Sequence, residues 1–253
     1  MIAILILSLV QGITEFLPVS SSSHLILISK FVNFGNQGLS IDVSLHIGSF
    51  IAVLTYFYKD IFNFFENRKL FIKIIISSIP VILIGYVLVR TNFIEEIRNI
   101  KVIAWMTIVF GILLYISDRF KLKKEIKTNF DLKAALIIGF FQAISLIPGV
   151  SRSGITITAA RLLNFKRFDS AKISFLLSIP TLAAVSIYGL NNIFTQEDLD
   201  FSIINLFSIF VSFLFSFFTI KFFLGFIQKF NLNLIIYYRI ILGLVLLYFA
   251  YLQ

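Results

Sequence analysis

The sequence predicts an all-α integral membrane protein with six transmembrane helices and two re-entrant helix–loop–helix hairpins, arranged as an inverted-topology repeat. Two observations predict the membrane location. First, 58% of the 253 residues are hydrophobic and 31 are phenylalanine, whereas soluble domains are roughly 45–50% apolar. Second, several apolar runs approach the roughly 20 residues that a helix needs to cross a bilayer. A β-barrel would instead show short segments of alternating polarity.

Six uninterrupted apolar segments are expected to be the transmembrane helices. They lie near residues 43–57, 71–89, 102–117, 173–190, 203–227 and 234–252. Two further apolar regions, near 1–33 and 132–163, are interrupted by FLPVSSSSH and LIPGVSRSG. Each half of these regions is too short to cross a bilayer as one straight helix. Polar, irregular backbone at membrane depth is tolerated only inside protein or beside a water-filled cavity, so we expect two re-entrant hairpins.

The distribution of Lys and Arg predicts the orientation of the chain. Four loops that would share one side carry 13 basic residues, whereas the segments on the other side carry 4. The basic loops are 58–70, 118–133, 164–172 and 228–233. Because cytoplasmic loops are enriched in basic residues, we expect both termini and the acidic loop 191–201 outside. The net charge of +9 then reflects membrane topology, and no nucleic-acid partner is expected.

The two halves of the single membrane domain, approximately 1–120 and 131–253, resemble each other. With an offset of 131 residues, QGITEFLPVSSS (11–22) aligns with QAISLIPGVSRS (142–153), and several polar positions coincide. Three predicted spans, an odd number, separate the two hairpins, so the second half would be inverted. Inverted repeats with broken helices bind ligands near the membrane midplane, where we expect the site.

The first interruption places polar and ionisable side chains inside an apolar region. Glu15 is the one acidic residue within an apolar segment, and such a carboxylate is functional by default. Gln11 lies one helical turn earlier, and these two side chains offer the oxygen ligands that Mg²⁺ or Ca²⁺ prefers. After Pro18, a half-helix would begin among serines that cap helices well, and its free N–H groups favour an anion such as phosphate. The candidate residues there are Ser20, Ser21, Ser22, Ser23 and His24.

The second interruption repeats this design with the opposite charge. Pro148 ends a half-helix, and Gly149 permits close backbone approach or a positive φ. Arg152 is always charged and presents a planar fork that suits phosphate, although a salt bridge to Glu15 is the alternative interpretation. Further hydroxyl groups near this helix start belong to Ser151, Ser153 and Thr156. For the serines of the first interruption, helix capping and close helix packing are the alternative roles.

Other polar residues in apolar regions are assigned no role in the site. Arg161 and Lys221 are expected to snorkel to the membrane surface or to pair. Arg239 follows two tyrosines near the cytoplasmic end of its span, which predicts an interfacial anchor. His46 is interpreted as a packing residue or a partner in a hydrogen bond between helices.

Taken together, the motifs Q-x-x-x-E, FLPVSSS-x-H, PGVSRSG-x-T and SFLLSIP (174–180) resemble those of the bacterial undecaprenyl-diphosphate phosphatases of the bacitracin-resistance type. The resemblance covers nearly the whole chain. It implies hydrolysis of undecaprenyl diphosphate to undecaprenyl phosphate and phosphate, which recycles the lipid carrier for peptidoglycan synthesis and confers bacitracin resistance. It also implies the bacterial cytoplasmic membrane as the location and a polyprenyl diphosphate lipid as the partner. A homodimer is an assembly that the sequence leaves open.

The resemblance implies catalytic roles for Glu15, Ser21, His24 and Arg152, and a metal site at Glu15 and Gln11. Arg152, the hairpin N–H groups and a divalent cation, Mg²⁺ or Ca²⁺, would neutralise the phosphoryl oxygens. The nucleophile is left open between Ser21, His24 and water, and His24 could instead act as base or acid. Substrate binding is expected from Gln11, Ser20, Ser22, Ser23, Gly149, Ser151, Ser153 and Thr156.

Two other classes of membrane protein share parts of this pattern. A lipid phosphatase of the phosphatidic-acid-phosphatase type needs a histidine several residues after a Ser-Arg pair, and no histidine follows Ser151 and Arg152. A lipid-phosphate transporter or flippase without hydrolysis agrees with inverted repeats and broken helices. It would have no need of Ser21 or His24 as reacting groups, so phosphate release by the isolated protein separates the two classes.

Overall fold

The fold is all-helical over the residues that the computed structural model describes, which are 2–31, 39–66, 68–91, 93–120, 123–195 and 203–251. Within these ranges, the one β-type contact is an isolated bridge between Lys124 and Phe165. The helices are α1 (Ile2–Thr14), α2 (Ser21–Phe31), α3 (Leu39–Tyr56), α4 (Tyr58–Glu66), α5 (Arg68–Arg90), α6 (Phe93–Ile97), α7 (Ile100–Asp118), α8 (Ile126–Asn129), α9 (Leu132–Ile144), α10 (Arg152–Leu162), α11 (Arg167–Thr195), α12 (Ile203–Lys229) and α13 (Asn233–Tyr251). The predicted all-α class is confirmed.

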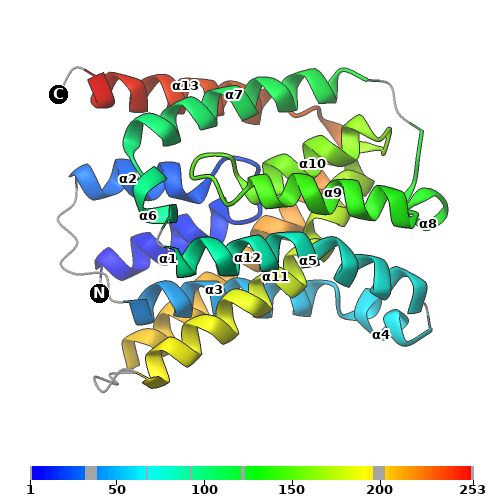
Figure 1. The fold of residues 1–253 in the computed structure, drawn as a ribbon, viewed down its shortest axis with the longest axis horizontal. Helices are drawn as coiled ribbons and strands as arrows, with labels where there is room; N and C mark the ends of the chain where they lie inside the picture. The colour runs from blue at the N-terminus through cyan, green and yellow to red at the C-terminus, as the bar shows by residue number, and fades with distance from the viewer. Residues whose placement is uncertain are drawn as a thin grey trace.

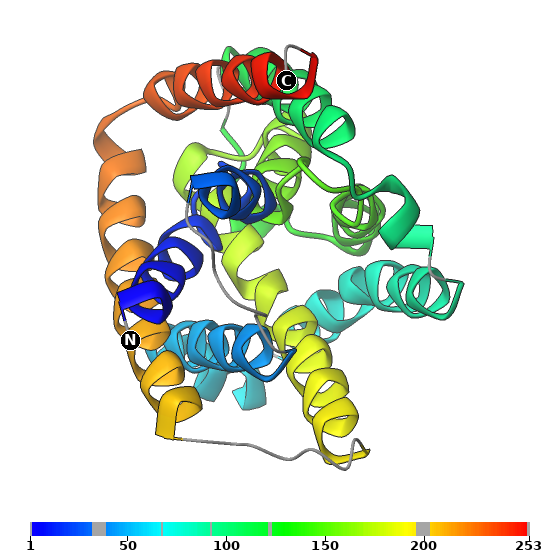
Figure 2. The ribbon, with the colours of Figure 1, turned by 90° about the vertical axis from the view of Figure 1, so that its left-hand side faces the viewer.

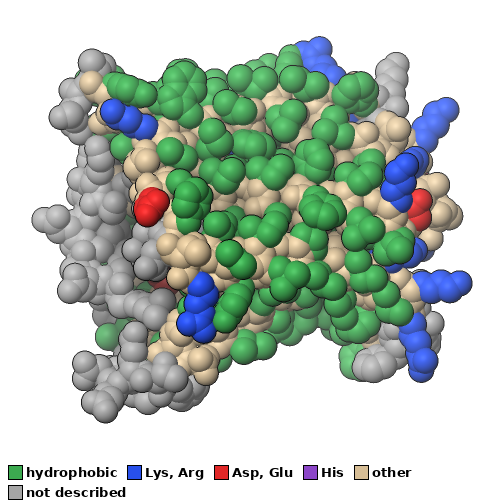
Figure 3. All heavy atoms as spheres, in the orientation of Figure 1, with side chains coloured by type: hydrophobic (Ala, Val, Ile, Leu, Met, Phe, Trp, Pro, Cys, Tyr) green, Lys and Arg blue, Asp and Glu red, His purple; other side chains and the backbone are tan. Residues whose placement is uncertain are grey.

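Five of the described helices, α5, α7, α11, α12 and α13, are long and apolar enough to cross a membrane. The span predicted near 43–57 corresponds to α3, whose apolar part is shorter, so the count of six spans stays a prediction. Large hydrophobic side chains are exposed along these helices. Figure 3 shows them as a broad band over one face, with Lys and Arg gathered mostly toward the two ends. A bilayer requires such an apolar belt between charged ends.

The two interrupted regions form helix–loop–helix hairpins. The first consists of α1 and α2, and the second of α9 and α10. In Figure 1 the first hairpin enters from the end where both termini lie, whereas the second enters from the opposite end, near α8. The connecting loops lie near the middle of the molecule. Viewed along the long axis, α2 lies in the middle and the longer helices surround it (Figure 2).

The two ends of the molecule differ in the chain segments that they carry. Both termini lie at one end of the molecule (Figure 1). At the other end lie α4 and α8, which fall within the predicted basic loops 58–70 and 118–133. This arrangement agrees with the topology expected from the basic residues. Most of the predicted acidic loop, residues 196–201, lies outside the described residues.

Close contacts between small residues hold α3 against α12. A β-carbon added to Gly48 of α3 would lie 2.4 Å from the main-chain oxygen of Ile209 in α12. Beside it, the Ser49 hydroxyl is 2.9 Å from that of Ser216, again in α12. Small side chains let backbones approach in membrane proteins, where dispersion and hydrogen bonds drive association. This packing fixes α3 and α12 as one wall of the interior.

An aromatic cluster anchors the first hairpin loop in the core. The ring of Phe16, in that loop, meets the edge of Phe175 in α11 with 5.3 Å between ring centroids. Phe57, just after α3, lies on another side of Phe175 at 6.4 Å. Phe16 and Phe175 are completely buried. Burial of such large rings contributes several kcal/mol, so the loop next to Glu15 has a fixed support.

Candidate active site

Both hairpin loops end in a serine with left-handed backbone. Ser20 has a φ of +75° and Ser151 a φ of +72°, although a residue with a β-carbon avoids this region by roughly 1–2 kcal/mol. The Ser151 hydroxyl accepts a hydrogen bond from the Gly154 N–H at 3.2 Å and caps α10. Gly149, with a φ of +95°, lies so close to α7 that a β-carbon would be 2.4 Å from the Ile103 oxygen. Strain of this kind persists only where the surroundings dictate the loop shape.

An ion pair between Glu15 and Arg152 joins the two loops. Arg152 Nη2 donates to Glu15 Oε1 at 2.9 Å, and the side chain of Arg152 is only 14% exposed and that of Glu15 10%. Arg152 Nη1 also donates to the main-chain oxygen of Ser174 at 3.3 Å. An unpaired buried charge is costly, and here each group has a partner of opposite charge. The salt bridge named as an alternative from the sequence is therefore present, and it places both charges at one point.

Gln11 contacts the same carboxylate. Its Nε2 donates to Glu15 Oε2 at 3.0 Å and lies 3.4 Å from His46 Nδ1. The contact with His46, in α3, agrees with the expected hydrogen bond between helices. Both oxygens of Glu15 therefore accept hydrogen bonds, one from Arg152 and one from Gln11. The carboxylate is held from two sides, which fixes its direction.

A cavity of about 130 Å³ lies between the two loops. Glu15, Ser21 and Arg152 all line it, so the structure brings three residues named from the sequence to one place. The rest of the lining is Thr14, Ser20, Ser145, Ile147, Pro148, Gly149 and Ser151. At roughly 30 Å³ per water molecule, this volume suits a small polar group and excludes a long hydrocarbon chain. The cavity therefore provides a polar pocket with a carboxylate, a hydroxyl and a guanidinium.

Two predicted binding residues of the second hairpin make structural hydrogen bonds instead of lining the cavity. The Ser153 hydroxyl donates to the Leu17 oxygen at 2.8 Å and so ties the second hairpin to the first loop. The Thr156 hydroxyl donates to the Ser174 hydroxyl at 2.7 Å and ties α10 to α11. These contacts indicate a packing role for Ser153 and Thr156, whereas the sequence predicted that they bind substrate.

Ser23, in the first hairpin, has a similar packing role. Its hydroxyl is 2.7 Å from that of Thr107 in α7 and 3.1 Å from that of Ser20. It is completely buried and lies outside the cavity lining. The side chain of Ser22 lies outside the described residues.

His24 does not line the cavity, and α13 holds it. Its Nδ1 lies 2.7 Å from the Ser20 oxygen, and its Nε2 lies 2.6 Å from the Tyr238 hydroxyl. Because a carbonyl oxygen only accepts, Nδ1 carries the proton, and in the neutral ring Nε2 accepts from Tyr238. The two rings also stack, with 5.6 Å between centroids. Within the described contacts, no hydrogen bond joins His24 to Ser21.

Arg239 is the residue that the sequence interpretation missed, and its assignment as an interfacial anchor is wrong. It is completely buried in α13. Its guanidinium donates to four main-chain oxygens, those of Pro18 at 3.1 Å, Gly149 at 3.2 Å, Val150 at 3.0 Å and Thr107 at 3.2 Å. It therefore connects both hairpin loops with α7. A charged residue inside an apolar span indicates a functional or structural role. The two preceding tyrosines, which are typical of the membrane interface, favoured the wrong interpretation.

Comparison with known proteins gives close matches over the whole chain. The family model described as "Bacitracin resistance protein BacA" matches residues 4–245. An undecaprenyl-diphosphatase of Pelagibacter ubique is 49% identical over 99% of this chain and 98% of its own length. Undecaprenyl-diphosphatases of Saccharophagus degradans and Jannaschia sp. are 42% and 36% identical. They cover 94% and 97% of this chain, and 93% and 97% of their own lengths.

Proposed function

The chain belongs to the family of the bacitracin resistance protein BacA, and on this basis we propose that it hydrolyses undecaprenyl diphosphate to undecaprenyl phosphate and inorganic phosphate. The reaction recycles the lipid carrier for peptidoglycan synthesis and accounts for bacitracin resistance. The observation that carries the proposal is the cavity where Glu15, Ser21 and Arg152 meet between the hairpin loops. Its size supports entry of the diphosphate headgroup, while the polyprenyl chain stays among the apolar helix faces.

Arg152 is the residue that would hold the transferred phosphoryl group. Diphosphate hydrolysis requires that negative charge on the phosphoryl oxygens be neutralised as the phosphorus is attacked. A guanidinium offers five N–H donors in a planar fork. Arg152 can therefore keep its bond to Glu15 while it binds phosphoryl oxygens. The ion pair would then orient the arginine before the substrate arrives.

Ser21 is the favoured nucleophile, and water is the alternative. Ser21 lines the cavity together with Glu15, whereas His24 is turned toward Tyr238. The Ser21 oxygen would attack the terminal phosphorus while its proton passes to Glu15. The bond from this phosphorus to the bridging oxygen would break, and undecaprenyl phosphate would leave. Water would then hydrolyse the phosphoserine; in the alternative, water attacks directly and no phosphoserine forms.

A divalent cation, Mg²⁺ or Ca²⁺, is part of the proposal. Among the described residues, no group of three or more His, Asp or Glu side chains could hold a metal ion. Glu15 supplies one carboxylate, and Gln11 can supply its amide oxygen. Mg²⁺ commonly binds one or two carboxylates together with substrate phosphates and water, so this donor set fits a cation that arrives with the diphosphate. When bound, the cation would neutralise charge on the phosphoryl oxygens.

We further infer that approximately 1–120 and 131–253 form an inverted repeat in the bacterial cytoplasmic membrane, with both termini outside. The helix contacts support this inference. The packing of α9 on α5 has a counterpart in that of α1 on α12, and α7 packs on its counterpart α13 as α3 packs on α11. The excess of basic residues in the loops opposite the termini supports the orientation. The homodimer stays a prediction.

Phosphate release from undecaprenyl diphosphate by the purified protein in detergent tests the proposed function. The variants are Glu15→Ala and Ser21→Ala, with Mg²⁺, Ca²⁺ or EDTA. Glu125→Ala, in an exposed loop, and Ser208→Ala, whose hydroxyl bonds within α12, are matched controls. Release that needs Glu15 and Ser21 but not the control residues supports the phosphatase. Absence of release from folded wild-type protein with either cation would favour the transporter.

A further inference from the structure

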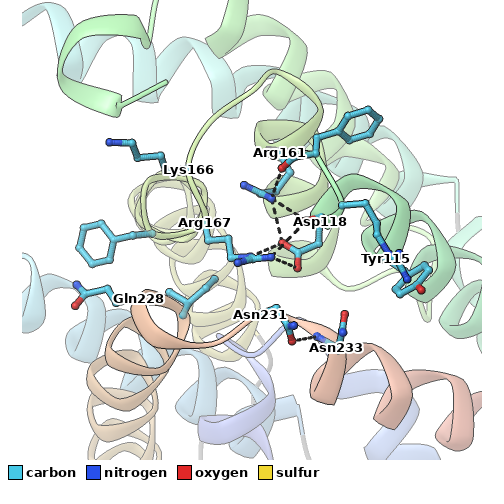
Figure 4. Close-up of a pocket in the computed structure, with 12 residues that line it drawn as sticks. Tyr115, Asp118, Arg161, Lys166, Arg167, Gln228, Asn231 and Asn233 are labelled. Carbon is cyan, nitrogen blue, oxygen red and sulfur yellow. Dashed lines mark hydrogen bonds and ion pairs between the residues drawn. The ribbon is translucent and has the colours of Figure 1, made fainter. Parts of the chain in front are cut away.

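A second cavity, of about 760 Å³, lies at the end of the molecule opposite the termini. It forms where α7 and α12 end and where α11 and α13 begin, and Figure 4 shows its polar lining. Its lining residues are Tyr115, Asp118, Arg119, Phe120, Arg161, Lys166, Arg167, Phe168, Ile227, Gln228, Asn231 and Asn233. It shares no lining residue with the cavity between the hairpin loops.

The lining of this cavity is strongly basic. Four of its residues are cations, namely Arg119, Arg161, Lys166 and Arg167, and among the described lining residues Asp118 is the one acid. Three side-chain amides, those of Gln228, Asn231 and Asn233, add neutral hydrogen-bond donors. Glu125, outside the lining, pairs with Lys166, and Asp118 is left with three arginines, so the cavity keeps an excess of positive charge. Such a potential favours an anionic ligand.

Asp118 forms ion pairs with two of the four cations, Arg167 and Arg161. Its Oδ1 accepts from Arg167 Nε at 2.8 Å and its Oδ2 from Arg167 Nη2 at 3.0 Å. Arg161 Nη2 lies 3.3 Å from Oδ1, and the main-chain N–H of Leu232 also donates to Oδ2. Figure 4 shows the two guanidiniums converging on this single carboxylate. The expectation that Arg161 would pair is thus confirmed, and its guanidinium is held in a fixed position.

Two donors of the cluster lack an acceptor or a counter-charge within the described part of the chain. Arg161 is 97% buried, and although its two terminal nitrogens have acceptors, its Nε–H lacks a hydrogen-bond partner there. Burial of such a donor is costly unless something accepts from it. Arg119 makes no ion pair among the described residues; it lies over the Tyr115 ring, 4.5 Å from its centroid. Lys166, by contrast, donates to Glu125. Among these residues the Arg161 Nε–H therefore lacks an acceptor, and Arg119 lacks a counter-charge.

We propose that this cavity binds a phosphate-bearing anion, the headgroup of an anionic phospholipid. Its place at the ends of membrane-spanning helices is where lipid headgroups lie. Its basic guanidiniums match phosphate geometry, and the side chains of Phe120, Phe168 and Ile227 give it an apolar side for glycerol and the first methylenes. Basic pockets between helices on the cytoplasmic side bind such headgroups. Free phosphate shares this chemistry and is the other source to be distinguished.

Calorimetric titration of the purified full-length protein in maltoside micelles tests the site. The probes are dihexanoyl phosphatidylglycerol, dihexanoyl phosphatidylcholine and inorganic phosphate. Because one basic residue near an anionic lipid surface contributes about 1 kcal/mol, Arg119→Gln should weaken binding of phosphatidylglycerol about five-fold. Lys133→Gln removes an exposed charge at the start of α9, at the same end of the molecule, and should leave this binding unchanged.

The outcomes separate the sources of the ligand. Stronger binding of phosphatidylglycerol than of phosphatidylcholine, with loss only in Arg119→Gln, supports a lipid headgroup. Binding of inorganic phosphate alone, with the same dependence on Arg119, supports the anion site and overturns the lipid. Equal binding of the two lipids without phosphate binding, or equal losses in both variants, overturns the site. Arg119 is exposed, so its substitution tests binding without loss of the fold, and the titration does not depend on hydrolysis.

Discussion

Replacement of Arg239 by methionine should release both hairpin loops at once. The guanidinium donates to Pro18 in the first loop and to Gly149 and Val150 in the second. Methionine has a comparable length but no donor, so these three buried oxygens and that of Thr107 in α7 would lose their partner. At about 1 kcal/mol for each hydrogen bond, the loss would be about 4 kcal/mol. Removal of a buried charge offsets part of it, which leaves a net loss of about 2 to 3 kcal/mol.

Turnover should fall further than this loss of stability suggests. The loops position Ser21 and Arg152, and a displacement of about 1 Å at a reacting group costs on the order of 10²-fold in rate. The assay pairs kcat for phosphate release with the melting temperature in detergent. Arg239→Lys keeps the charge but has a single nitrogen, which cannot reach both loops. It should lose kcat while it retains more of the stability. Lys221→Met, which removes an exposed charge from α12, is the control.

Three results would refute this reasoning. Wild-type kcat in Arg239→Met with a lowered melting temperature would show that the arginine supports only the fold. Unchanged kcat and melting temperature together would show that the loops hold their shape without it. A loss of kcat in Lys221→Met of similar size would show that any charge change in these helices is damaging.

Three further changes have expected outcomes. Glu15→Gln leaves Arg152 without its counter-charge, so phosphate release should be lost and the melting temperature should drop by the equivalent of about 3 kcal/mol. Gly149→Ala adds a β-carbon 2.4 Å from the Ile103 oxygen at a φ of +95°, and it should destabilise the protein by about 2 kcal/mol or more; wild-type stability in a denaturation assay would contradict the loop geometry. Gln142→Met removes a buried amide whose two polar atoms have no partner among the described residues, so it should raise the melting temperature by the equivalent of about 1 kcal/mol with unchanged turnover.

The positions of the two helix–loop–helix regions could be predicted from short sequence features, because polar breaks stand out clearly within membrane-spanning apolar runs. The regions predicted near 1–33 and 132–163 contain α1 with α2, and α9 with α10. Proline and serine interrupt the apolar runs at these points, and membrane-embedded backbone tolerates such a break only under protein cover. The span predicted near 43–57 corresponds closely to α3 (Leu39–Tyr56), whereas α11 (Arg167–Thr195) extends beyond the predicted 173–190 at both ends, because its flanking polar turns gave no apolar signal.

The charged pair of the site could be predicted, but the roles of its neighbours could not. Glu15 and Arg152 are charges in apolar segments, which is a local property. Arg239 is also such a charge, yet its loop acceptors lie 89 to 221 residues away, so no nearby residue indicated them. For the same reason, the sequence could not show that Tyr238 holds His24. It also could not separate Ser21, which lines the cavity, from serines that only pack.

The inferred repeat explains why one hairpin carries the carboxylate and the other the guanidinium. At the offset of 131 residues, Glu15 corresponds to Leu146 and Ser21 to Arg152. Identical hairpins meeting at their tips would place like charges together in a medium of low dielectric constant, where repulsion is large. With a carboxylate on one hairpin and a guanidinium on the other, the repulsion is replaced by an ion pair. This arrangement also places Glu15 and Ser21 on the hairpin opposite Arg152, the proposed phosphate-binding residue. Gln142 is the counterpart of Gln11. Four residues later the first half has Glu15, whereas the second half has Leu146, which cannot accept a hydrogen bond from the amide. Under the inferred repeat, the amide of Gln142, which has no partner among the described residues, would be the stability cost of two similar hairpins that carry different chemistry.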